Sequence, residues 1–180
     1  MQADFSQDYF ELLGLARGFE VDAETLAVRY RDLQRALHPD RFAGASDRER
    51  RLSVQQTARV NEAYRTLKDP LARARYLLEL NGVALDDTDT AMDPGFLMEQ
   101  MELREALGAV RDAADPFGRL GEVRDRIEGQ ERDLVRELSS RLSQATPEDL
   151  EQAREAVRRL QFMRKLLEEA DGIEEDLVHG

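Results

Sequence analysis

The 180-residue sequence contains no cysteine, only two histidines and five prolines, and no long apolar run. Without cysteine, the chain itself can form no disulfide, no cysteine zinc site and no cysteine-ligated iron–sulfur cluster. A histidine metal site is poorly supported as well, because His179 lies at the very end, and we expect neither a metal nor a cofactor. No run approaches the roughly 18 apolar residues of a membrane span. The N-terminal segment lacks the features of a secretory signal, so we expect the cytoplasm.

Charge is distributed unevenly along the chain. The formal net charge is −12, with 26 basic and 38 acidic side chains. Residues 1–80 hold 13 of each sign, whereas residues 81–180 hold 25 acidic and 13 basic side chains. Two regions of different charge suggest two tasks. The acidic excess argues against a nucleic-acid role, since phosphates require clustered Lys and Arg.

Apolar periodicity, caps and prolines predict an all-α protein. Asp8, Asp22 and Asp47 are expected N-caps, and Pro39 should end the second helix at His38. The acidic, aperiodic segment 81–94 is the expected linker between domains 1–80 and 95–180. The expected helices are a short one after Asp8 that stops at Gly14, one from Asp22 to His38, and others at about 48–67, 71–80, 95–114, 117–144 and 147–170, with a frayed tail. The last three, joined by short loops, predict an antiparallel bundle.

The tripeptide His38-Pro39-Asp40 follows a helix whose outer face carries arginines. A catalytic interpretation, with a histidine oriented by a carboxylate, needs a nucleophile or a substrate pocket nearby. The sequence has no nucleophile-elbow motif and no Gly-rich phosphate loop. Taken alone, the three residues favour an ordinary helix stop.

The surrounding segments change that interpretation. DYFELLGL, YRDLQRALHPDRF and NEAYRTLKDP resemble the corresponding segments of the J-domain family. The resemblance implies an antiparallel helix hairpin with short flanking helices. It also implies that the protein is not an enzyme but stimulates ATP hydrolysis by a DnaK-type heat-shock chaperone. It implies a chaperone-binding set in which the tripeptide is essential and the arginines are electrostatic contacts: His38, Pro39, Asp40, Arg29, Arg31, Arg35 and Arg41, the last replacing a more usual Lys.

The segment 95–110 carries two different apolar sectors. One helical face holds four residues that suffice to bury the helix, namely Phe96, Leu103, Leu107 and Val110. A second sector holds Leu97, Met98 and Met101, extended by Glu102 and Glu105. The pattern fits a partner surface rimmed by acids and a fully buried helix in a thicker bundle equally well.

Three further segments, LARARYLLELNG, FLMEQMELREAL and VRRLQFMRKL, make nearly the whole chain similar to the HscB family. That resemblance implies a C-terminal three-helix bundle, the family's oligomerisation-type domain. In the family the bundle binds the iron–sulfur scaffold protein IscU and brings it to the chaperone HscA. Carried over by position, the scaffold-binding residues are Leu97, Met98, Met101, Glu102, Glu105 and Phe162.

Two alternatives remain at this point. A general J-domain co-chaperone would bind unfolded client proteins, but the chain has neither a Gly/Phe-rich linker nor a cysteine zinc module. A helical enzyme would use His38 and Asp40 as acid and base, and would turn over without a chaperone.

Overall fold

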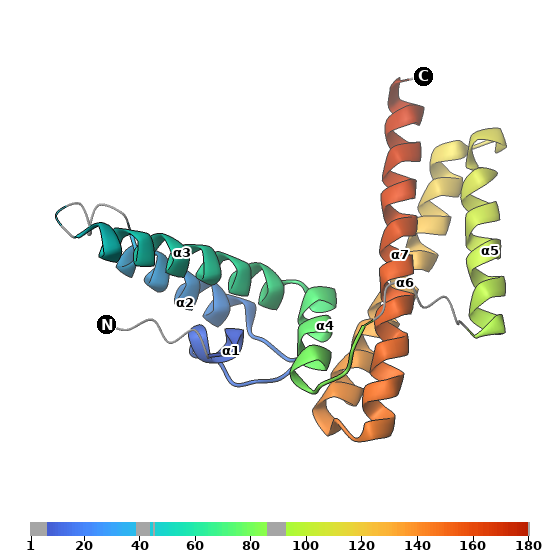
Figure 1. Cartoon of the computed structure of the whole chain (residues 1–180). Helices are drawn as coiled ribbons and strands as arrows, with labels where there is room; N and C mark the ends of the chain where they lie inside the picture. The colour runs from blue at the N-terminus through green and yellow to red at the C-terminus, as the bar shows by residue number, and fades with distance from the viewer. Residues whose placement is uncertain (1–6, 39–43, 45, 86–92, 180) are drawn as a thin grey trace. The chain divides into compact units, whose positions relative to one another are not determined.

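The computed structural model is all-α and describes residues 7–38, 44, 46–85 and 93–179 (Figure 1). The predicted fold class is therefore confirmed, with no strand in the described part of the chain. The chain divides into two compact units, Met1–Asn81 and Gly82–Gly180. None of the described helices is long and apolar enough to cross a membrane.

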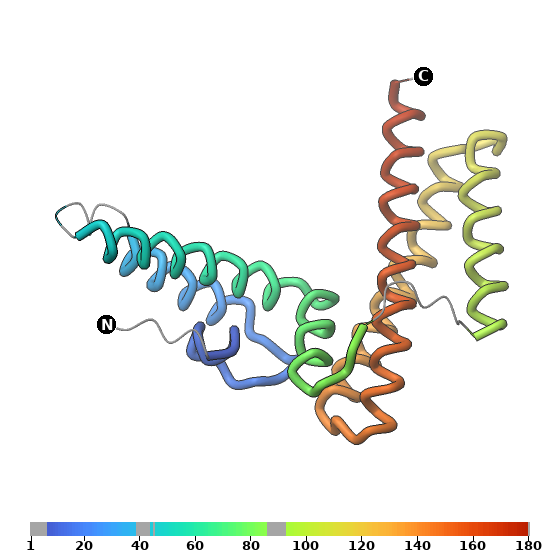
Figure 2. Tube along the Cα trace, viewed as in Figure 1, coloured from blue at the N-terminus to red at the C-terminus, as the bar shows by residue number. Residues whose placement is uncertain are grey.

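The first unit is built around a pair of antiparallel helices. Its helices are α1 (Tyr9–Leu12), α2 (Ala23–Ala36), α3 (Asp47–Lys68) and α4 (Pro70–Leu80). Figures 1 and 2 show α2 and α3 side by side, and both α1 and α4 pack against α3. The core consists of Phe10, Leu13, Phe19, Leu26, Val60, Ala63, Leu67, Ala74, Leu77 and Leu78, all at most 4% exposed.

Side-chain caps fix where these helices begin. Asp8 and Asp22 cap α1 and α2 as predicted, accepting hydrogen bonds from the backbone N–H groups three residues on. The predicted Asp47 cap of α3 is wrong. Ser46 is the N-cap and forms a capping box with Glu49, whose carboxylate accepts from the Ser46 backbone N–H at 2.9 Å. The reciprocal pair satisfies two backbone donors at once, which a lone Asp47 cannot do.

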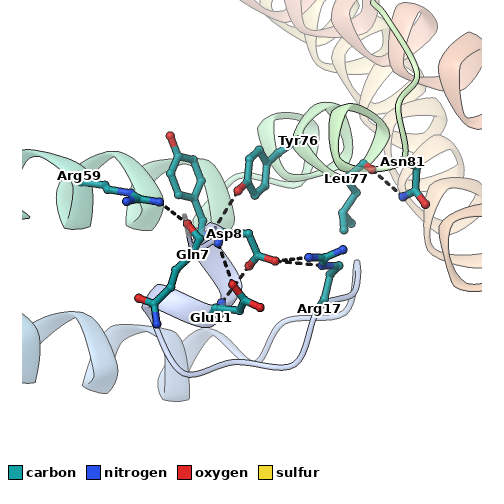
Figure 3. A network of polar contacts seen from close by, with 9 residues as sticks. Gln7, Asp8, Glu11, Arg17, Arg59, Tyr76, Leu77 and Asn81 are labelled. Atoms are coloured by element: carbon teal, nitrogen blue, oxygen red, sulfur yellow. Dashed lines mark hydrogen bonds and ion pairs between the residues drawn. The ribbon is translucent and has the colours of Figure 1, made fainter. Parts of the chain in front are cut away.

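A polar network joins the start of the chain to α4 (Figure 3). The Asp8 carboxylate, only 7% exposed, forms an ion pair with Arg17. The Tyr9 backbone N–H donates to the Tyr76 hydroxyl at 3.0 Å, and the two rings stack with centroids 4.4 Å apart. These contacts hold α1 against the rest of the unit. With only 4 residues, α1 forms few helical hydrogen bonds of its own.

The second unit is a bundle of three helices. They are α5 (Pro94–Gly108), α6 (Pro116–Gln144) and α7 (Pro147–His179), with a 3-10 turn, η2 (Val110–Asp112), after α5. The core is formed by Phe96, Leu103, Leu107, Val110, Leu120, Val123, Ile127, Phe162, Met163, Leu166, Ala170 and Ile173. Antiparallel α6 and α7 make most of the contacts, and ion pairs such as Arg124 with Asp171, at 2.7 Å, link them.

Two helix ends differ from the sequence prediction. The helix expected to reach residue 114 stops at Gly108 and is followed by η2. The helix expected to end near residue 170 continues to His179. Ile173 is buried and Leu177 is half-buried against the same core as Ala170, so packing extends the helix despite its acidic end. Of the predicted linker, residues 82–85 lie outside any helix, and residues 86–92 lie outside the described part.

Candidate interaction surfaces

The helix α2 presents one face to α3 and another to solvent. Leu26 is buried, while Leu33 and Leu37 follow it on the same face and are half-buried. Arg31 and Arg35 are both exposed and lie one helical turn apart on the outer face. Two cations at this spacing can meet one acidic partner together.

Two details refine the predicted basic face. The Asp32 carboxylate pairs with the Arg35 guanidinium at 3.4 Å, and both side chains are largely exposed, at 60% and 78%. Arg29 is two residues before Arg31, so it points about 160° away around the helix. Its guanidinium lies beside the turn at Gly14, where an added Cβ would be 3.9 Å from its Nε. The outer face therefore holds Arg31 and Arg35, and Arg29 lies on a separate flank.

The tripeptide begins directly after α2. Leu37 is the C-cap of α2, its N–H donating to the Leu33 carbonyl at 2.9 Å, and His38 follows it as an exposed residue. Pro39, Asp40 and Arg41, which were predicted to bind the chaperone, lie outside the described residues.

A polar layer between α2 and α3 was missed by the sequence prediction. The Tyr30 hydroxyl donates to Asn61 Oδ1 at 3.0 Å, and Gln34 Nε2 donates to the same hydroxyl at 2.7 Å. The ring of Tyr30 stacks on Tyr64 with centroids 4.1 Å apart. By spacing alone, Tyr30 shares the apolar face of α2 with Leu26, Leu33 and Leu37. A tyrosine with Gln34 one turn further on is the signal that could have indicated this layer, since a partly buried hydroxyl usually has a partner.

The helix α5 separates a buried face from an exposed apolar patch. The four residues predicted to face the core are at most 4% exposed, which confirms that part of the pattern: Phe96, Leu103, Leu107 and Val110. By contrast, Leu97 is 43%, Met98 66% and Met101 71% exposed. We call these three the α5 patch. Within this unit the fully buried interpretation is wrong, because the described helices of the bundle leave the patch exposed.

Acidic side chains border the α5 patch. Glu102 and Glu105 are exposed, as the helical pattern suggested. The Glu102 carboxylate also pairs with Arg126 of α6 at 3.3 Å, with side chains 63% and 49% exposed. Nearer the start of α5, Gln130 of α6 donates a hydrogen bond to Glu99. These contacts tie α5 to α6 and leave Glu105 at the outer border.

Phe162 differs from the other predicted scaffold contacts. Its side chain is only 8% exposed and belongs to the core of the bundle. The ring packs edge-on against Phe96, and the Arg104 guanidinium lies over it, 5.2 Å from its centroid. Phe162 therefore lies beneath α5, and its predicted role in scaffold binding stays a prediction.

No described residues bring together three or more His, Asp or Glu side chains in a way that could hold a metal ion. What the described residues do present is two exposed surfaces, one on each unit: the outer face of α2 with His38, and the α5 patch with its acidic border.

Comparison with known proteins identifies both units. Residues 8–76 match the model of the DnaJ domain, and residues 92–171 match that of the HSCB C-terminal oligomerisation domain. Two proteins named "Co-chaperone protein HscB homolog", from Shewanella sp. strains ANA-3 and MR-4, are 45% and 46% identical over 172 residues, covering 95% of this chain and 99% of theirs. The chain belongs to the HscB family of co-chaperones. Its N-terminal unit is thus a J-domain, and the family's role is that of an Hsp70 co-chaperone in iron–sulfur cluster assembly.

Solved HscB structures have the same fold. The chaperone HscB from Vibrio cholerae is 43% identical, with a TM-score of 0.86 over 95% of this chain and 99% of that one. The human co-chaperone HscB is 32% identical, with a TM-score of 0.88 over 97% of this chain and 85% of that one. The predicted HscB resemblance is confirmed by both the sequences and the structures.

Proposed function

We propose that this HscB-family chain is a two-ended adaptor with no catalysis of its own. Its J-domain stimulates ATP hydrolysis by an HscA- or DnaK-type chaperone, and its bundle binds an IscU-type scaffold protein and delivers it to that chaperone. The setting we propose is the cytoplasm. The observation that carries the proposal is that each unit exposes a different kind of surface: cationic on α2 and apolar with an acidic border on α5.

At the chaperone end, the proposed contacts are His38, Pro39, Asp40, Arg29, Arg31, Arg35 and Arg41. The exposure of Arg31 and Arg35 supports electrostatic attraction of an acidic partner, which speeds encounter and sets orientation. Pro39 restricts its own φ and the conformation of the residue before it, so less conformational entropy is lost when the tripeptide docks. Arg29, on its separate flank, is the weakest member of this set.

At the scaffold end, the proposed contacts are Leu97, Met98 and Met101 with Glu102 and Glu105. An apolar patch on a helix whose other face is already buried supports binding of a partner. Two methionines give it adaptable contacts. The acidic border and the excess negative charge of residues 81–180 favour a scaffold with basic side chains around an apolar centre. Phe162 contributes by supporting α5 from beneath.

The test is the ATPase rate of the purified chaperone alone, with this protein, and with this protein plus the scaffold. We expect the protein to raise the rate and the scaffold to raise it further. Replacing the scaffold by an extended apolar peptide tests the general J-domain alternative. If the peptide is as effective as the scaffold, the bundle is not dedicated to one client. If the protein never raises the rate, the proposal is wrong.

A further inference from the structure

The hairpin of α2 and α3 has its apolar core toward one end, and His38 follows α2 at the other end. The buried apolar residues of the two helices are Leu26, Val60, Ala63 and Leu67. Between Val60 and the start of α3, the one buried residue that the structure describes is Ser53, at 4% exposed. Ser53 lies seven positions before Val60, about 10 Å along the helix. The tip of the hairpin therefore lies well beyond the apolar core.

Ser53 forms a hydrogen bond between α3 and the end of α2 at this tip. Its hydroxyl donates to the backbone carbonyl of Leu37 at 3.0 Å. Leu37 is the C-cap of α2, and the carbonyls at the end of a helix have no partner within the helix itself. The hydrogen bond gives the Leu37 carbonyl a donor from α3, one residue before His38.

We propose that Ser53 is a positioning residue for the chaperone-docking tripeptide. By holding the Leu37 carbonyl, it fixes the point and direction from which the chain enters His38-Pro39-Asp40. The inference rests on the proposed function and adds to it a residue that does not itself meet the chaperone, because Ser53 is buried. The half-buried Leu33, Leu37 and Leu52 contribute non-directional packing nearby. A hydrogen bond, by contrast, constrains one backbone group in orientation.

The expected effect follows from population arithmetic. If the docking arrangement is populated for a smaller fraction of time, the apparent dissociation constant rises in inverse proportion to that fraction. A neutral hydrogen bond of ordinary strength corresponds to about a threefold to tenfold change. In Ser53→Ala, the protein concentration needed for half-maximal ATPase stimulation should rise by that factor. The maximal rate should be unchanged, because the tripeptide is intact.

Two further variants separate positioning from general damage. Ser53→Cys keeps nearly the same volume but replaces the hydroxyl by a weak donor, so it should behave like Ser53→Ala. Thr57→Ala is the matched control: the Thr57 hydroxyl donates to the Ser53 carbonyl at 2.9 Å, a hydrogen bond within α3. The concentration of Thr57→Ala needed for half-maximal ATPase stimulation should equal that of the wild type. All variants are compared at a temperature where their helical circular dichroism equals that of the wild type.

Amide hydrogen exchange on the full chain gives a readout that needs no chaperone. The amides of Leu37 and His38 should exchange faster in Ser53→Ala and Ser53→Cys than in the wild type or Thr57→Ala. The inference is overturned if exchange and half-maximal stimulation in both Ser53 variants match the wild type. It is also overturned if Ser53→Cys restores wild-type behaviour, or if Thr57→Ala has the same effect. Failure of the proposed function is distinguishable, because then wild-type protein fails to stimulate while the exchange result stands.

Discussion

The rings of Phe96 and Phe162 pack edge to face, with centroids 5.9 Å apart and planes at 81°. Each ring also has a guanidinium beside it: Arg159 lies 5.0 Å from the centroid of Phe96, and Arg104 lies 5.2 Å from that of Phe162. The pair joins α5 to α7. Since Leu97 directly follows Phe96, holding the Phe96 ring in the core orients the α5 patch toward solvent.

Phe162 is expected to affect scaffold binding through this packing. Phe162→Leu and Phe96→Leu each lose the aromatic pair and repack the core, and each should lower the free energy of unfolding by about 1–2 kcal/mol. Both should weaken scaffold binding to a similar degree. Denaturant unfolding and titration calorimetry measure the two effects. A much larger loss of binding for Phe162→Leu at equal stability would instead mean that Phe162 contacts the scaffold directly.

The exposed side chains of the α5 patch should matter for binding and little for stability. Replacing Leu97 and Met101 by alanine is expected to weaken scaffold binding about thirtyfold or more, as truncation of interface anchors commonly does. The free energy of unfolding should change by no more than about 1 kcal/mol, because both are exposed. Val178→Ala is the control, since Val178 is an apolar residue of the same bundle and is 65% exposed. If calorimetry shows the same loss of scaffold affinity for Val178→Ala and for the patch variant, the scaffold-binding surface lies elsewhere.

Asp32 is expected to moderate the cationic face of α2. Asp32→Asn removes the carboxylate that pairs with Arg35, so half-maximal chaperone stimulation should need about twofold less protein at low salt. The gain should shrink as ionic strength rises, because both groups are exposed. Asp133→Asn makes the same charge change at the similarly spaced Asp133–Arg136 pair of α6. If Asp133→Asn gives an equal gain, net charge rather than the α2 face is responsible.

Asp8 should make the stability of the J-domain depend on pH. Burial raises the pKa of the Asp8 carboxyl, but hydrogen bonds from the Glu11 backbone and the Arg17 guanidinium outweigh it, and the pKa lies below its ordinary value of 3.8 (Figure 3). A lowered folded-state pKa adds stability above the unfolded-state pKa, and this stability is lost as pH falls through the folded-state value. Asp8→Asn should therefore cost about 1–3 kcal/mol at pH 7 and progressively less in acid. Urea unfolding at a series of pH values measures this, and a cost independent of pH would contradict it.

Much of the fold follows from local signals. The caps at Asp8 and Asp22 and the buried stripe of α5 need only residue type and spacing, and the structure has them as predicted. The same periodicity left Leu97, Met98 and Met101 off the core face, where they are exposed. Helical spacing determines which side chains share a face, and a face already filled with apolar residues leaves the others outside.

Other features depend on which helices meet, and this cannot be deduced from spacing. The acidic tail after residue 170 was expected to fray. Packing of Ile173 and Leu177 against the core extends α7 through it instead. Phe162 matched a predicted contact by position, but its burial depends on Phe96 from another helix. Ser53 carries no motif, and only the approach of α3 to the end of α2 brings its hydroxyl to the Leu37 carbonyl.

The most direct test of the two-ended adaptor is one ATPase assay with two variants, each altered in one unit. His38→Gln should fail to stimulate the chaperone, with or without scaffold, yet should bind the scaffold like the wild type in calorimetry. The Leu97→Ala, Met101→Ala variant should stimulate the chaperone normally without scaffold and lose the added stimulation that the scaffold gives. If His38→Gln stimulates like the wild type, or if the patch variant retains the scaffold's added effect, the account of the corresponding end is wrong.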